Sequence, residues 1–240
     1  MKSPTASDLL ETWEIGLEQS ALKGLLVLLT KTFDLPDADA AAQQSIGERD
    51  AELLQLREEL FGTKLVNKAH CPKCAETLEW EMNTREMQIQ TPPFESPPRV
   101  YDLEAPPFRL RFRLPNSKDI LTPAAYARHI LLDCILEVTD DGKDFPKKDL
   151  PASVLDSLSK DMEKKDPQAH ITMVLTCAAC AEIFTVVFDI VNYLWAEIDN
   201  WAKHMLQEIF VLARAFGWSE RDIISMSAHR RKLYLDMLQK

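Results

Sequence analysis

Apolar residues recur at helical spacing through the first quarter of the chain. Residues 7–33 carry leucines three and four positions apart, which predicts helical structure with Gly24 as a candidate break. Residues 34–47 alternate Asp and Ala around a proline, so we expect a loop there. Glu48–Leu60 repeats the helical pattern, and Gly62 stands where a glycine ends a helix.

The middle of the chain changes to a period of two, which is typical of half-buried strands. Thr77–Met82 alternates polar and apolar residues, and Phe108–Leu114 places apolar residues on one side and arginines on the other. Residues 89–107 between them hold six prolines, which predicts an extended connector. His170–Thr176 and Ile183–Phe188 are rich in β-branched and aromatic residues and are predicted as further strands.

Helical periodicity returns on both sides of those last strands. Thr122 and Pro123 form an N-cap and first-turn pair for a helix that ends near Cys134. A charged turn at Lys143–Lys148 precedes a predicted helix over Pro151–Lys165.

The C-terminal part is expected to be helical throughout. Tyr193–Phe216 is predicted as a long helix that Gly217 ends. Ser219 and Asp222 form a capping pair for a short helix, and Ser227 begins a last one.

Four of the five cysteines stand in two Cys-x-x-Cys pairs, Cys71 with Cys74 and Cys177 with Cys180. Each pair offers two thiolates at the spacing of a zinc knuckle, and two knuckles complete a tetrahedral Cys₄ site. Four thiolates leave no open position for water or substrate, so the pattern predicts a structural Zn²⁺. Four unrelated buried cysteines and a redox pair are the alternatives.

The cysteine pairs set the expected architecture. We predict an α+β protein with a zinc-ribbon-like β centre and flanking and inserted helices. Residues 1–62 form an N-terminal helical region, and residues 63–190 form the β region, with inserted helices at about 122–165. Residues 191–240 form a C-terminal helical segment, and the whole is expected to pack as one compact unit. The remaining cysteine, Cys134, lies on an apolar helix face and is predicted to be a core residue.

Composition and charge narrow the class of protein. The net charge is −10, so there is no general electrostatic attraction to nucleic acid or to an anionic membrane. Cysteines in metal-type pairs and an N-terminus without a signal-peptide pattern favour the cytoplasm of the producing cell. Residues 171–188 are apolar enough to suggest a membrane span. Glu182 and the knuckle cysteines instead favour a buried metal-binding hairpin.

Catalysis has little support in the sequence. The six glycines never cluster, so no phosphate-binding loop is present, and no Gly-x-Ser-x-Gly motif occurs. The last two helices resemble a DNA-binding helix pair in outline, but their basic content is too small. The C-terminal third is instead rich in residues that anchor protein interfaces. We expect an interface among the following residues: Trp195, Trp218, Arg230, Arg231 and Tyr234.

Six stretches follow one another along the chain: Glu48–Gly62, Cys71–Cys74, Arg113–Ile120, Cys177–Cys180, Phe188–Trp195 and Leu212–Ile224. In this order they resemble a family of phage-like baseplate proteins, similar to the T-even phage baseplate protein family. The most specific part is the C-terminal Gly-Trp-Ser-Glu and Arg-Arg-Lys-Leu-Tyr-Leu block. The family often has glycine after the second cysteine of a knuckle, where Ala75 and Ala181 stand here.

The resemblance implies a function without catalysis. Members of the family are encoded within contractile injection system and related tail gene clusters. The chain is therefore expected to be a structural component or assembly factor of a baseplate, in contact with other baseplate or tail-hub proteins. It would be cytoplasmic or incorporated in a phage-tail-like particle. A zinc-dependent assembly chaperone that is absent from the mature particle is the alternative.

Overall fold

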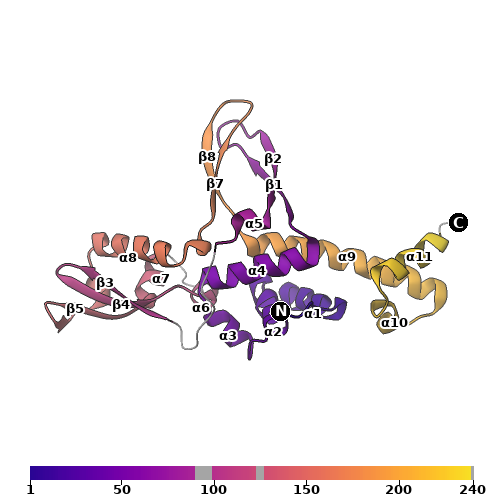
Figure 1. The fold of residues 1–240 in the computed structure, drawn as a ribbon, viewed down its shortest axis with the longest axis horizontal. Helices are drawn as coiled ribbons and strands as arrows, with labels where there is room; N and C mark the ends of the chain where they lie inside the picture. The colour runs from indigo at the N-terminus through magenta and orange to yellow at the C-terminus, as the bar shows by residue number, and fades with distance from the viewer. Residues whose placement is uncertain (90–98, 123–126, 239–240) are drawn as a thin grey trace. The chain divides into compact units, whose positions relative to one another are not determined.

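The computed structural model describes residues 1–89, 99–122 and 127–238. The chain divides into two compact units, whose elements are labelled in Figure 1. The first unit joins Met1–Ala38 to Ile190–Lys240 and is helical where described, whereas the second, Asp39–Asp189, contains every strand of the described residues. Both ends of the chain therefore build one unit. This division differs from the expected succession of three regions in one compact body.

The first unit begins with two helices where the sequence predicts one helical stretch with a break. Helix α1 spans Ala6–Glu18 and helix α2 spans Ala21–Phe33. The break lies at Ser20, whose hydroxyl accepts from the backbone N–H of Lys23 and caps α2. Gly24 lies inside α2, at a position where a Cβ would come 2.5 Å from the Thr12 carbonyl oxygen of α1. This glycine allows the two helices to pack closely.

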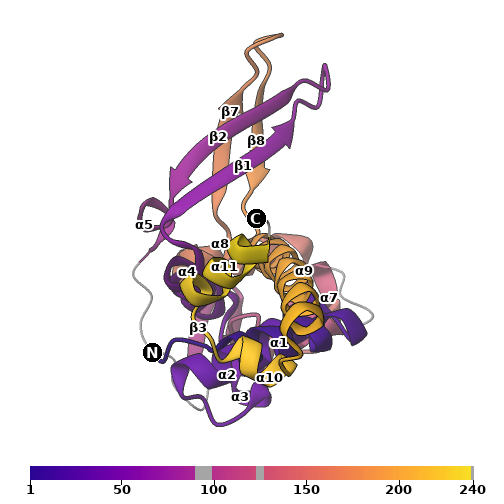
Figure 2. The same ribbon diagram turned by 90° about the vertical axis from the view of Figure 1, so that its right-hand side faces the viewer.

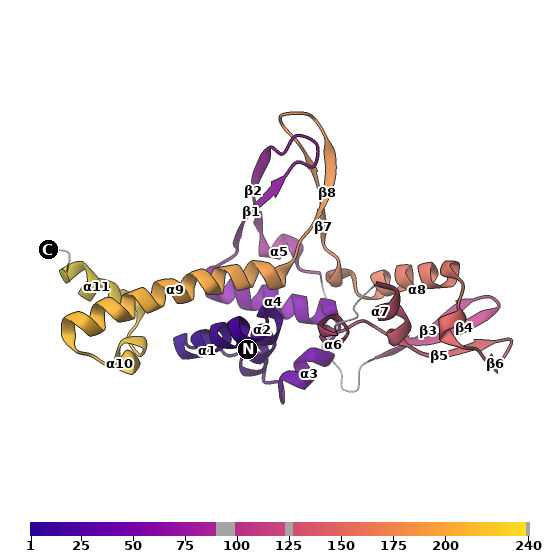
Figure 3. The same cartoon turned by 180° about the vertical axis from the view of Figure 1, so that it is seen from behind.

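The C-terminal helices complete the first unit. The long helix α9 (Ile190–Phe216) ends at Gly217, which has a φ of +68°, as predicted. The short helix α10 (Glu220–Ile224) and helix α11 (Ala228–Leu238) both pack on α9 (Figure 3). The predicted Ser219–Asp222 capping box is present. Helices α9 and α10 share a hydrophobic core with α1, which is made by Leu10, Ala202, Met205, Ile209, Leu212 and Ile223.

The second unit contains a four-stranded antiparallel sheet. Its order is β3 (Val100–Ala105), β4 (Phe108–Arg113), β5 (Ile135–Asp140), β6 (Lys143–Asp144). The predicted alternation of β4 is confirmed, because Phe108, Leu110 and Phe112 are buried while Arg109 and Arg111 are exposed.

Two helices pack with this sheet into one hydrophobic core. They are α7 (Ala127–Cys134) and the predicted α8 (Ala152–Lys165), which is preceded by a 3₁₀ turn η1 (Lys147–Asp149). Cys134 is fully buried in this core, as predicted.

The sequence patterns missed several short elements. Helix α3 (Ala38–Gln43) lies in the expected loop, and strand β3 lies at the end of the proline-rich connector. Thr122, which was predicted as the N-cap of a helix, is instead the residue that ends helix α6 (Ser117–Leu121). The prolines at 92, 93, 97, 98 and 123 lie outside the described residues. Such short elements contain too few residues for a hydrophobic periodicity to be recognised.

Helix α4 (Ile46–Phe61) is held within the second unit by hydrogen bonds near its start. A capping box of Ser45 and Glu48 begins it, and Gly62, with a φ of +83°, follows it. Near its start, the backbone N–H of Ile46 donates to Pro115 and the guanidinium of Arg49 donates to the Ser117 hydroxyl at 3.0 Å. These bonds join α4 to the loop that leaves β4.

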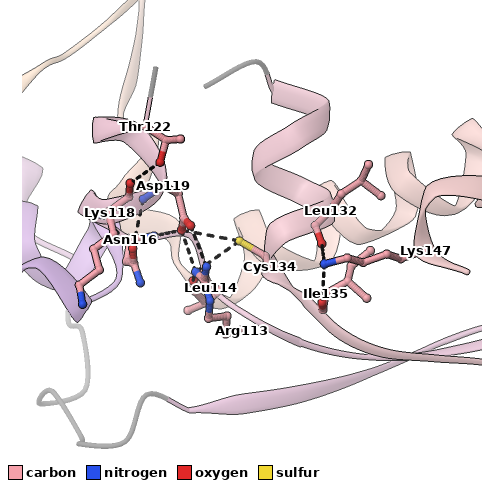
Figure 4. A network of polar contacts seen from close by, with 10 residues as sticks. All are labelled: Arg113, Leu114, Asn116, Lys118, Asp119, Thr122, Leu132, Cys134, Ile135 and Lys147. Atoms are coloured by element: carbon pink, nitrogen blue, oxygen red, sulfur yellow. Dashed lines mark hydrogen bonds and ion pairs between the residues drawn. The ribbon is translucent and has the colours of Figure 1, made fainter. Parts of the chain in front are cut away.

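That loop is held by a half-buried ion pair (Figure 4). Arg113 donates two hydrogen bonds of 2.7 Å to the two carboxylate oxygens of Asp119. Asp119 also accepts from the backbone N–H of Asn116 at 2.8 Å, and the Cys134 thiol lies 3.6 Å from the Arg113 guanidinium. Burial by itself raises the pKa of Asp119, but the bonds from Arg113 and Asn116 outweigh it and hold that pKa below its usual value.

We expect Asp119→Asn to lower the free energy of unfolding of the second unit by about 3 kcal/mol at pH 7, because it leaves a half-buried guanidinium without its counter-charge. A carboxyl with a depressed folded-state pKa contributes stability above its unfolded pKa, and this contribution is lost as the pH falls through the folded value. The difference between wild type and variant should therefore shrink below about pH 4. Urea unfolding across pH measures both effects. Asp102→Asn is the matched control, since its exposed pair with Arg111 should contribute under about 1 kcal/mol.

Candidate metal centre

Two β-hairpins carry the knuckles. Strand β1 (Lys64–His70) pairs with β2 (Thr77–Asn83), and β7 (Thr172–Thr176) pairs with β8 (Ile183–Val187). Strands β2, β7 and β8 were predicted, whereas β1 was not. Each knuckle is the turn of its hairpin, and the two hairpins of the second unit rise side by side (Figures 1 and 2).

The four knuckle sulfurs meet at one place. The Sγ atoms of Cys71 and Cys180 are 3.6 Å apart, as are those of Cys74 and Cys177. All four sulfurs lie within 4.8 Å of one another. A tetrahedral ion with bonds of about 2.3 Å separates its sulfur ligands by about 3.8 Å. The cluster therefore has the dimensions of a four-coordinate thiolate site.

The two knuckles have the same backbone design. In the first, Cys71 N donates to Glu76 O at 2.9 Å and Ala75 N donates to Cys71 O at 2.9 Å. The corresponding bonds of the second knuckle run from Cys177 N to Glu182 O at 2.8 Å and from Ala181 N to Cys177 O at 2.9 Å. The position after each second cysteine is left-handed, with a φ of 60° at Ala75 and 59° at Ala181. Alanine adopts this conformation only at a cost.

The thiol groups differ in acidity. Burial raises the pKa of Cys71, but hydrogen bonds from the backbone N–H groups of Cys74 and Lys73 outweigh it and lower that pKa to about 7. The backbone amide of Glu182 favours the Cys180 thiolate, yet burial and the neighbouring thiols raise its pKa to about 12. Thiolates at this spacing repel one another, so a divalent cation would be needed to hold all four in the ionised form.

The bases of both hairpins are fixed near α4. At the first hairpin, Glu58 of α4 accepts from the Thr84 hydroxyl at 2.9 Å, in the short helix α5 (Thr84–Met87) that follows β2. Before the second hairpin, Asp166 accepts from the backbone N–H of Gly47 at 2.9 Å. At the tips, Lys73 and Glu182 form an ion pair of 3.3 Å across the knuckles. The hairpins are thus joined at the base and at the tip.

The expected burial of the second hairpin is wrong for one of its faces. Its alternate residues are exposed, and they include the apolar residues Val174 at 71%, Ile183 at 66% and Val187 at 59%. We define the open face of β7–β8 as the exposed residues Thr172, Val174, Thr176, Ile183, Thr185 and Val187. The hairpin itself is confirmed. Among the described helices, none combines the length and apolarity of a membrane span.

The candidate interface residues lie in the helical unit, with different exposures. Trp195 packs where a Cβ on Gly16 would overlap its ring. Trp218 stacks on Phe216 with ring centroids 4.5 Å apart and meets Tyr234 at 4.8 Å, and Arg230 lies exposed over Tyr234 at 5.8 Å.

The last candidate, Arg231, is buried. Its guanidinium donates to Glu208 at 2.8 Å and to the Met226 carbonyl at 2.6 Å. This arginine therefore fastens α11 to α9.

One comparison with known proteins gave a match. A family described as "T4 bacteriophage base plate protein" matches residues 7–195. The matched range includes both knuckles, α4 and the loop after β4, and it ends before the C-terminal Gly-Trp-Ser-Glu block. Neither the curated proteins nor the solved structures contain a significant match.

We expect Ala75→Gly and Ala181→Gly each to stabilise the metal-bound hairpins by about 0.5–1 kcal/mol. The left-handed conformation costs an L-residue roughly 1–2 kcal/mol, and the greater chain entropy of glycine offsets part of the gain. Thermal unfolding at saturating metal measures the change. Ala178→Gly is the control in the same turn: its φ is not positive, so it should stabilise nothing. Equal or lower melting temperatures for the first two variants would contradict the assignment of strain to these alanines.

Proposed function

Since this chain belongs to the T4 bacteriophage base plate protein family, we propose that it is a non-enzymatic structural component or assembly factor of a baseplate. The particle is a contractile injection system or a phage-like tail, and the chain acts in it through contacts with other baseplate or tail-hub proteins. The family match supports the baseplate role, because it covers 189 of the 240 residues, from 7 to 195.

The observation that carries the mechanism is the meeting of four sulfurs from two hairpins that are far apart in the sequence. We propose that Cys71, Cys74, Cys177 and Cys180 bind one structural Zn²⁺. Four sulfur donors in a tetrahedral arrangement suit zinc, and they leave no position for a reacting water. The ion would clamp the hairpins into one rigid arm. A rigid arm presents a fixed surface and loses little entropy when a partner binds.

The proposed contacts are with protein rather than with nucleic acid or membrane. The net charge of −10 gives no basis for phosphate binding. Aromatic and arginine residues of the helical unit are candidate anchors for further contacts, with Trp195, Trp218 and Tyr234 half-buried and Arg230 exposed. We place the protein in the cytoplasm of the producing cell until it meets its particle.

Cys71→Ser should release the metal and unfold the two hairpins, since binding free energy at a structural zinc site is folding free energy. The helical unit has its own core and should keep its circular dichroism signal. Metal content by mass spectrometry and thermal unfolding measure the two effects.

Cys134→Ala is the matched control, because that cysteine lies in the sheet core apart from the cluster. It should retain one zinc ion per chain. A Cys71→Ser protein with unchanged metal content and melting would exclude the structural site.

The place of the protein in assembly is tested on purified particles. Quantitative mass spectrometry should find this chain at a fixed ratio to the other baseplate proteins. A chain that is required for assembly yet absent from finished particles would instead identify the zinc-dependent chaperone. A particle that forms normally without the chain would contradict both roles.

A further inference from the structure

The two hairpins present chemically different faces to solvent. On β1–β2, charged residues pair across the strands: Lys68 with Glu79 at 2.7 Å and Lys64 with Glu81 at 2.6 Å. Such pairs keep a sheet face soluble and discourage association. The open face of β7–β8 carries no charge, and all six of its residues are β-branched.

The open face is also arranged as three regular cross-strand pairs. Thr172 lies opposite Val187, Val174 opposite Thr185, and Thr176 opposite Ile183. The exposed fractions of Val174, Ile183 and Val187 are 71%, 66% and 59%. Exposed apolar residues that are isolated are ordinary on a protein surface, but here three strongly exposed apolar side chains share one uncharged sheet face.

The size of the face argues against a stable dimer of this chain through that face alone. Five residues at about 3.4 Å on two strands about 4.8 Å apart give a footprint of roughly 160 Å². Two such faces in contact cover several hundred Å² at most, whereas a stable interface buries about 1,200 Å² or more. The face is therefore suited to one contact among several within a larger assembly.

The chemistry of the face specifies the chemistry of its partner. A charged partner residue would lose its water against the open face and find no counter-charge there. Flat sheet faces of β-branched residues pack on each other about 10 Å apart. The hairpin is held at its base through Asp166 and at its tip by the cysteine cluster, so the face is preorganised.

We propose that the open face of β7–β8 is a docking surface for an uncharged sheet face of a second, different baseplate protein. This inference rests on the proposed baseplate function and adds the site and the chemistry of the contact. The charged face of β1–β2 stays in solvent in the same complex.

Val174→Lys tests the docking surface, with Val66→Lys as the matched control on the exposed face of β1. Each full-length variant replaces the wild type in producing cells, and its amount in purified baseplates is measured by mass spectrometry. Val174→Lys should lower incorporation at least about tenfold, because an interfacial lysine is left without a counter-charge. Val66→Lys should be incorporated as wild type. Both variants should keep the zinc content and melting temperature of the wild type, which excludes misfolding.

A photo-reactive residue in place of Val174 identifies the occupant. We expect cross-links to an uncharged strand of another baseplate protein, and none of comparable yield from position 66. Cross-links to a second copy, with a dimer in gel filtration that Val174→Lys dissociates, would overturn the choice of partner. So would flotation of the wild type, but not of Val174→Lys, with phosphatidylcholine–phosphatidylglycerol vesicles.

The two levels of the hypothesis fail in different ways. Wild-type and Val174→Lys chains incorporated equally would overturn the docking surface and leave the baseplate function intact. Absence of the wild type from both finished particles and assembly intermediates would overturn the baseplate function itself.

Discussion

The fold of the second unit depends on one long-range contact, in which two turns more than a hundred residues apart bring four cysteine sulfurs together. The paired sulfurs are separated by 109 and 103 positions in the sequence. Closing a flexible loop of that length costs about 4 kcal/mol in chain entropy. The Zn²⁺ proposed for these sulfurs would contribute about 10–16 kcal/mol of binding free energy, which is more than that cost. The other contacts between the hairpins are smaller, since the ion pair of Lys73 and Glu182 is largely solvated.

The chain between the knuckles is an independently packed region rather than a loose insertion. Its sheet and its helices share a core that includes Phe108, Leu110 and Phe112. The bidentate pair of Arg113 and Asp119 then sets the loop that receives the start of α4. Because α4 and the residues beside it also hold the bases of both hairpins, the position of the cysteines depends on this region. The cysteine cluster and the sheet therefore support each other through helix α4.

A rigid support and a surface without reactive groups suit a protein that acts by binding other proteins. The site is closed to substrates once four sulfurs surround an ion, and the strained alanines of the knuckles have no reactive group. The charged face of β1–β2 and the uncharged face of β7–β8 make the two sides of the arm chemically different. The proposed docking of the uncharged face would leave the ion pairs of the charged face in water, so these pairs would not be desolvated.

The sequence by itself determined the features that depend on near neighbours. The two knuckles, the alternation of β4, the long helix α9 and its end at Gly217, and the capping box of α10 all follow from spacing within one turn or strand. It also predicted that the four knuckle cysteines share one site, and the structure brings their sulfurs together. Only the tertiary structure decided which distant segments share a core: the ends of the chain form one unit, Arg231 is buried against Glu208, and one face of β7–β8 stays open. A period of two shows that a strand has two faces, but which of them is covered depends on residues far away in the chain, and no local pattern records them.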